Sequence, residues 1–239
     1  MGKSKPNGPM ENFIEEMNLS DVDFVRHNET DFDAFREFTT NHEARYKNAE
    51  SLKEKEIHRK NYSSFVSTIP QRWRQATLSS FKDRETAIEI RKMIKSKQRG
   101  YFIAGPYGSG KTHLAYSILK IFVKAGKLKP SQIRVITESD LLSLANGGFE
   151  TRSALESIFD SKYKAYVLDG LGSKDHYEEK REQPAISKLI EEAYSRSALF
   201  IATSHMSLDF YCEGISLSSV SRMKQMVENG VVLTGEPES

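Results

Sequence analysis

The chain has 239 residues, of which 38% are hydrophobic, 28% charged and 10% aromatic, as in a globular protein with one large domain and room for a small module. Its net charge of +2 is too small to indicate nucleic-acid binding, and its apolar runs are far shorter than the ~20 residues of a membrane-spanning helix. The single cysteine, Cys212, excludes an internal disulfide and the usual thiolate zinc sites. The amino terminus lacks the apolar centre of a signal peptide, so we expect a cytoplasmic protein with no membrane partner.

Residues 1–66 are highly charged and carry apolar residues at helical spacing. These apolar positions are Phe13, Ile14, Met17, Phe32, Phe35 and Phe38. Charge dominates from His42 to Lys60, which predicts one largely solvated helix. We therefore predict a small helical module over 1–66, or a helical extension that packs on the main domain over 67–239. A module of this size has little core of its own, so part of the Phe32–Phe38 stripe would be available to a partner.

From Ile69 onward, short apolar strands alternate with helices. The strands are predicted over Tyr101–Ala104, Arg134–Thr137, Ala165–Asp169, Leu199–Ser204 and Val231–Thr234. The helices are predicted over Asp83–Lys97, Lys111–Ala125, Leu141–Leu144, Leu155–Phe159, Glu182–Arg196 and about Ser218–Glu228, with a capping box over Thr137–Asp140. This alternation predicts an α/β domain in which helices cover both faces of a parallel sheet.

A glycine-rich segment after the first predicted strand satisfies the phosphate-loop pattern G-x-x-x-x-G-K-[ST]. Its residues are Gly105, Pro106, Tyr107, Gly108, Ser109, Gly110, Lys111 and Thr112, and His113 follows directly. The glycines allow backbone N–H groups to turn toward phosphates, and the helix that follows directs its positive amino terminus at them. We expect Lys111 to reach the β- and γ-phosphates of ATP, Thr112 to ligate Mg²⁺, and His113 to belong to the same site.

A second motif is the apolar strand that ends at Asp169. An aspartate there would orient the water shell of Mg²⁺, as the Walker B residue does in phosphate-loop ATPases. Many such ATPases carry another acid directly afterwards, but here the next residue is Gly170. Either hydrolysis is weak, or a nearby acid such as Asp175 takes its place.

Two further residues are candidates by position. The strand Leu199–Ser204 ends in polar residues followed by His205, and the carboxyl ends of parallel strands line the ligand crevice of an open α/β sheet. His205 is thus expected to face the γ-phosphate, or to be an ordinary loop residue. Arg222 lies on the last predicted helix, from which an arginine can complete the ATP site of a neighbouring subunit; a surface salt bridge is the alternative.

With these motifs in view, residues 69–235 resemble the DnaC/IstB-type AAA+ ATPases, a class that includes bacterial and phage helicase loaders. The segments that carry the resemblance are Ile69–Phe81 (IPQRWRQATLSSF), the Walker A loop Gly105–Thr112, the Walker B run Tyr166–Gly172 (YVLDGLG), the sensor-1 strand Ile201–Ser207 (IATSHMS), Ser221-Arg222-Met223 and Val232–Gly235. The fold implied is an AAA+ parallel sheet flanked by helices, preceded by the small helical module.

The resemblance also implies roles for individual residues. It makes Arg222 the arginine finger, and it puts His205 at the position where the family usually has the sensor-1 asparagine. The predicted helices over 141–159 fall where this class has an insertion that contacts single-stranded DNA, so Phe149 and Arg152 become candidates for base stacking and phosphate contact. Core packing and ordinary solvation are the alternatives for these two residues. The amino-terminal module would bind the replicative helicase.

The sequence departs from the family pattern at Gly170, at His205 and at a carboxyl terminus without the usual late basic residue. These departures leave ATP binding intact and predict slow hydrolysis. The resemblance implies an ATP- and Mg²⁺-dependent loader that self-associates with ATP and binds a hexameric replicative helicase and single-stranded DNA during replication. An IstB-like transposition ATPase and a nucleotide-sensing adaptor with little hydrolysis are the two alternatives.

Overall fold

The computed structural model describes residues 50–172, 184–209 and 216–235. The chain divides into two units, 1–57 and 58–239, and the second contains the whole sheet. The stripe Phe32–Phe38 and the other apolar positions predicted before residue 50 lie outside the described residues. None of the described helices combines the length and the apolar character needed to cross a membrane.

The centre of the second unit is a five-stranded parallel sheet with the strand order β2-β3-β4-β1-β5. The strands are β1 (Gly100–Ala104), β2 (Ile133–Thr137), β3 (Ala165–Leu171), β4 (Leu199–Ser204) and β5 (Val231–Leu233). The three central strands β3, β4 and β1 are almost wholly buried. Burial on both faces explains why they read as continuous apolar runs rather than as alternating patterns.

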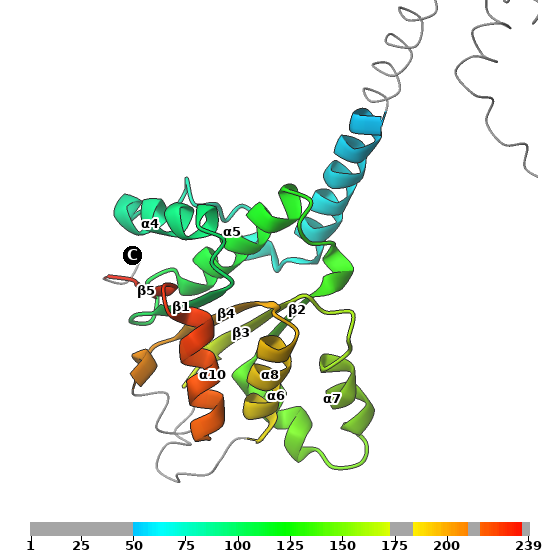
Figure 1. Cartoon of the computed structure of the whole chain (residues 1–239), viewed down its shortest axis with the longest axis vertical. Helices are drawn as coiled ribbons and strands as arrows, with labels where there is room; N and C mark the ends of the chain where they lie inside the picture. Colours follow the sequence, from blue (N-terminus) through cyan, green and yellow to red (C-terminus); the bar gives the residue numbers. More distant parts are fainter. Residues whose placement is uncertain (1–49, 173–183, 210–215, 236–239) are drawn as a thin grey trace, which may run out of the picture. The chain divides into compact units, whose positions relative to one another are not determined.

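Helices cover both faces of the sheet, with α4 (Arg84–Lys95) and α5 (Lys111–Lys124) on one face (Figure 1). The opposite face carries α6 (Glu138–Asn146), α7 (Arg152–Ile158), α8 (Pro184–Ser195) and α10 (Leu217–Val227). Two short 3₁₀ turns, η1 (Gln71–Trp73) and η2 (Pro130–Gln132), precede α4 and β2. The predicted α/β class is confirmed, and each predicted strand and helix from Asp83 onward is present within a few residues of its expected bounds.

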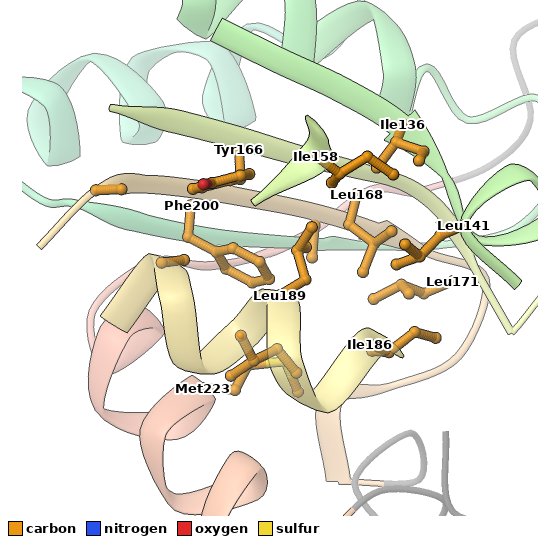
Figure 2. Packing of buried hydrophobic residues seen from close by; sticks show 14 of the residues in the cluster. Ile136, Leu141, Ile158, Tyr166, Leu168, Leu171, Ile186, Leu189, Phe200 and Met223 are labelled. Carbon is orange, nitrogen blue, oxygen red and sulfur yellow. The ribbon is translucent and has the colours of Figure 1, made fainter. Parts of the chain in front are cut away.

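Alternate residues of the strands face the two helical layers. On β1, Tyr101 and Ile103 pack with α4 and α5, whereas Phe102 and Ala104 pack with α8 and α10. Figure 2 shows the second of these cores, in which side chains of β3 and β4 meet those of α8 and Met223 of α10. The period of two along each strand therefore lets β1, β2, β3 and β4 supply both cores, whereas β5 supplies only the core with α4 and α5, through Val232.

The first described helix covers residues 50–68, so the predicted end at Lys60 is wrong. It continues because its last turns are not solvated: Phe65 is 3% exposed and belongs to the core formed with α4 and α5. Arg74 holds the end of this helix, since its Nε donates to the Ile69 carbonyl at 2.9 Å and its Nη2 to the Ser67 carbonyl at 3.2 Å. Residues 42–49 of the predicted helix lie outside the described part.

Candidate nucleotide-binding site

The glycine-rich segment Gly105–Thr112 joins β1 to α5, as predicted. Gly108 and Gly110 have φ angles of 79° and 84°, in the left-handed region that is about 1–2 kcal/mol less favourable for other L-residues. A Cβ on Gly105 would overlap the Thr234 hydroxyl, so this position excludes side chains for steric reasons. These features make glycine necessary at all three positions of the loop.

Lys111 begins α5 and folds back over the loop. Its Nζ donates to the carbonyl oxygens of Gly105, at 2.9 Å, and Pro106, at 2.6 Å, and lies 5.8 Å from the centroid of the Tyr107 ring. Burial lowers the pKa of Lys111, and the nearby Asp169 carboxylate raises it in part. A partly desolvated ammonium group at a helix amino terminus is well suited to bind an anion such as a phosphate.

The Asp169 carboxylate joins three elements of the site. Oδ1 accepts hydrogen bonds from the Thr112 hydroxyl of α5, at 3.0 Å, and from the Thr203 hydroxyl of β4, at 2.6 Å. Thr203 in turn accepts a hydrogen bond from the Gly170 amide at 2.8 Å. The structure thus brings Asp169 to Thr112, which lies 57 positions earlier in the sequence. It also adds Thr203, which the sequence offered, with Ser204 and His205, as a residue that could face the γ-phosphate.

Gly170 lies in a break of the sheet. The pairing of β3 with β4 is irregular between Leu168 and Leu171, and Gly170 has a φ of 77°. An acid at this position would have to adopt a left-handed backbone, so the missing second Walker B acid is linked to the local strand geometry. The predicted substitute, Asp175, lies outside the described residues.

A buried acid that the sequence interpretation treated only as part of a capping box lies at the same edge. Glu138 is 2% exposed, and its Oε2 accepts a hydrogen bond from the Gly172 amide at 2.8 Å. The cap itself is confirmed, because Thr137 Oγ1 accepts from the Asp140 amide at 3.0 Å. An acid directly after a predicted strand was the available signal for Glu138, since the carboxyl ends of parallel strands share one edge.

His205 contacts the phosphate loop through an aromatic partner. Its ring stacks on that of Tyr107 with a centroid distance of 5.1 Å and an interplanar angle of 20°. The Tyr107 hydroxyl oxygen lies 3.5 Å from His205 Nδ1. His205 therefore contacts the glycine-rich loop through Tyr107, a pairing that was not predicted, and its expected position facing the γ-phosphate stays a prediction.

Ser109 and Thr234 connect the loop to the end of the chain. Ser109 Oγ and Thr234 Oγ1 are 2.6 Å apart, and Thr234 Oγ1 donates to the Ala104 carbonyl at 3.0 Å. Both residues are buried. Thr234 is a site residue that sequence reasoning missed, because only the pairing of β5 with β1 brings residue 234 beside residue 105.

His113 faces away from the rest of the loop cluster. Its Nε2 lies 2.9 Å from the Thr77 carbonyl oxygen, and its ring contacts Trp73 and Phe81. About two turns later on α5, Lys120 is 4% exposed and donates to the carbonyl oxygens of Trp73, Arg74 and Ala76. Burial lowers the pKa of Lys120. The helix that begins with Lys111 is therefore fixed to the segment 73–81.

Arg222 is part of a different layer. Its guanidinium group pairs with the Glu191 carboxylate of α8, and both side chains line a cavity of about 800 Å³ between α8 and α10. Its contact within the described chain is thus with α8 rather than with the phosphate loop. A residue that acts on a neighbouring subunit has no need to reach the loop of its own chain.

The two candidates for DNA contact lie around the turn between α6 and α7. Phe149 is 88% exposed, so core packing is excluded as its role. Arg152 is also exposed, and its Nε pairs with Glu156 Oε1 at 3.1 Å along α7. An exposed pair of this kind contributes little to stability, so Arg152 can readily exchange partners.

Comparison with solved structures identifies the fold. The match to the DnaC helicase loader covers 69% of this chain and 99% of the DnaC chain, with 21% identity and a TM-score of 0.51. The match to DnaI covers 72% of this chain and 93% of the DnaI chain, with 15% identity and a TM-score of 0.50. The match to a replication initiator, DnaA, bound to AMPPCP and single-stranded DNA, covers 72% of this chain and 52% of the DnaA chain, with 18% identity and a TM-score of 0.50.

The similarity in sequence to known proteins is local. The ESX-3 secretion system protein EccA3 of Mycobacterium leprae is 30% identical over 90 residues, which are 36% of this chain and 14% of that protein. No protein-family model matches the chain. The structural likeness, together with the five-stranded parallel sheet, shows that the chain has the fold of the DnaC and DnaI structures.

Proposed function

We propose that this chain is an ATP-binding AAA+ protein that loads a replicative helicase onto single-stranded DNA. The proposal of an ATP site rests on one cluster: Lys111 folds over the glycine loop, and the hydroxyls of Thr112 and Thr203 donate hydrogen bonds to the Asp169 carboxylate. Burial of Lys111 and the left-handed glycines of the loop fit a bound triphosphate, because both favour binding of an anion between backbone N–H groups.

Mg²⁺ fits the same cluster. The Thr112 hydroxyl and the Asp169 carboxylate are 3.0 Å apart, and both are oxygen donors of the kind that Mg²⁺ prefers. When bound, the ion would neutralise charge on the β- and γ-phosphates. Lys111 would hold the same phosphates, and Thr203 would keep the Asp169 carboxylate oriented.

The loader role has support from the fold and from the insertion between β2 and β3. The similar DnaC structure is that of a helicase loader, and the similar DnaA structure holds single-stranded DNA. Phe149, at 88% exposure, and Arg152 offer an aromatic ring and a cation on one turn, which suits a single strand. In this proposal the residues before 67 bind the helicase, and Arg222 acts on the ATP of a neighbouring copy.

A second candidate function, a nucleotide-sensing adaptor with little hydrolysis, is favoured by Gly170. Its left-handed backbone disfavours an acid at the position after Asp169. Turnover stimulated by single-stranded DNA, and lost in Lys111→Ala, would argue against this candidate. An IstB-like role in transposition would instead show a preference for duplex DNA.

The proposal is tested by native mass spectrometry of the full chain with the replicative helicase of its source organism, with and without ATP and Mg²⁺. We expect a discrete complex with several copies per helicase hexamer. The matched control is Lys111→Ala, for which we expect loss of ATP binding in a filter assay. A folded, ATP-bound protein that forms no complex in either state would reject the loader role.

A further inference from the structure

A cationic cavity lies away from the nucleotide site, at the edge of the sheet where β1, β3 and β4 begin. It has a volume of about 440 Å³, and four exposed cations line it: Lys97, Arg99, Lys127 and Lys164. No carboxylate is among its lining residues. Within the described part of the chain, none of these four side chains forms an ion pair.

Three helix ends surround this cavity, and their partial charges oppose the cations. The helices α4, α5 and α8 each end in a Schellman motif, which is formed by the 5→2 and 6→1 backbone hydrogen bonds of the turn. Residues that line the cavity follow directly after each of these helix ends. Each helix carboxyl end carries roughly −0.5 of a charge. Three such ends amount to about −1.5, so the four side chains leave the cavity with an excess of positive charge.

The backbone at two of these turns is unusual. Gly126 occupies the left-handed position after α5, with a φ of 69°, as expected for this motif. The corresponding positions after α4 and α8 are occupied by Lys97, with a φ of 63°, and Ser197, with a φ of 51°. They are the only non-glycine residues with positive φ in the described ranges, and both line the cavity. Left-handed non-glycine residues are less stable and concentrate at functional sites.

The shape of the surface indicates an extended ligand. A second cavity of about 330 Å³ adjoins the first, because both are lined by Lys97, Arg99 and Ser197; the lining of the second includes one carboxylate, that of Glu228. Aromatic side chains line both: Phe122, with Lys127 Nζ 5.5 Å from its ring centroid, in the first, and Tyr194, 39% exposed, in the second. A row of cations beside aromatic rings is the usual arrangement for a single nucleic-acid strand.

We propose that this groove, lined by Lys97, Arg99, Lys127 and Lys164, binds the phosphate backbone of a single-stranded nucleic acid. The groove is distinct from the Phe149–Arg152 turn, and its binding does not depend on the nucleotide site. The cations would contact successive phosphates, and Phe122 and Tyr194 would provide surfaces for bases. The excess positive charge makes the binding sensitive to salt.

The test measures fluorescence anisotropy of a labelled oligo(dT) of about 20 nucleotides, without ATP, over a range of salt concentrations. In the variant Lys127→Gln/Lys164→Gln we expect the affinity for oligo(dT) to fall at least about tenfold. The slope of log affinity against log salt concentration should become shallower by about 1.4, because each of the two lost phosphate contacts accounts for about 0.7. The matched control is Lys82→Gln/Lys224→Gln, which removes the same charge from two exposed positions that do not line the groove and should leave both quantities unchanged. Repeating the titration in Lys111→Ala, where binding should persist, separates this proposal from the ATP site.

A single substitution at Lys97 separates binding from folding. Lys97→Gly removes a cation but suits the left-handed backbone, so we expect Tm to rise by about 2 °C while oligo(dT) affinity falls. Equal affinity in the groove variant and in the wild type would overturn the proposal, as would equal losses in the groove and control pairs. Tighter binding of a polyglutamate peptide than of oligo(dT) at the same groove would assign it to an acidic protein segment instead.

Discussion

The ring of Tyr107 stacks on the ring of His205, with centroids 5.1 Å apart, and so joins the phosphate loop to the end of β4. Lys111 Nζ lies on the same Tyr107 ring at 5.8 Å. Tyr107 therefore connects Lys111, which is proposed to hold the γ-phosphate, with His205, which the resemblance places at the sensor-1 position. A change in one of these two loops is expected to reach the other through this contact.

The first prediction concerns this stack. Tyr107→Ala removes the ring and should weaken ATP binding or turnover about 2- to 10-fold, because aromatic pairs contribute about 0.5–1.5 kcal/mol beyond their buried area. Tyr107→Phe keeps the stacking surface and is the matched control, with near-normal values expected. Measured ATP affinities and steady-state rates for the two variants decide this, and an alanine variant indistinguishable from wild type would show that the stack has no role.

The second prediction concerns Gly170. Both Gly170→Ala and Gly170→Glu place a side chain on a backbone with a φ of 77°, so each should lower the free energy of unfolding by about 1–2 kcal/mol in urea denaturation. If the missing acid limits turnover, Gly170→Glu should hydrolyse ATP at least about tenfold faster than Gly170→Ala. The alanine variant carries the same strain, so the ratio isolates the carboxylate. Equal rates would point to another acid or to a protein that does not turn over ATP.

The third prediction tests Arg222 through its partner Glu191. If Arg222 acts on a neighbouring copy, Arg222→Ala should preserve ATP binding and lose the part of hydrolysis that depends on protein concentration. Glu191→Gln should free the guanidinium group and lower the protein concentration at half-maximal rate. Lys224→Ala, on the same helix, is the control for a lost surface charge. If instead the pair is only a surface salt bridge, both variants should lose 0–1 kcal/mol of stability and hydrolyse normally.

The fourth prediction concerns alkaline pH. Burial raises the pKa of Tyr101, Tyr116 and Tyr166 above the ordinary value of 10.0, so the folded state favours their neutral form. This stabilisation is complete below pH 10.0 and is lost as the pH rises toward the raised values.

Burial lowers the pKa of Lys111 and Lys120. As the pH rises toward 10.5, their pKa in the unfolded state, these two lysines therefore increase the free energy of unfolding, and above pH 10.5 they change it no further. Above pH 10.5, therefore, the free energy of unfolding should fall steadily in urea titrations. Tyr101→Phe should reduce the slope of that fall, because it removes the phenol whose pKa burial raises. A slope that is identical in Tyr101→Phe and in the wild type would contradict the assignment to Tyr101.

Much of the site could be predicted because its signals are local in sequence. The phosphate loop Gly105–Thr112 combines a turn, a cation and a helix start, and each is encoded by neighbouring residues. The strand predicted to end at Asp169 has the apolar run and terminal acid of a Walker B element, although the strand in the structure continues to Leu171. The resemblance to DnaC-type proteins likewise rested on short contiguous segments, and the fold matches that expectation.

The sequence by itself determined the α/β class, the phosphate loop and the candidates Asp169 and His205, because strand and helix periodicity and loop chemistry act over a few residues. Only the tertiary structure decided that Thr234 meets Ser109, that Lys120 holds the turn at Trp73, and that Glu138 is buried beside Gly172. These contacts join residues 34–125 positions apart. Their partners are fixed by the order of strands in the sheet and by the need of buried polar groups for hydrogen bonds, neither of which is visible along the chain.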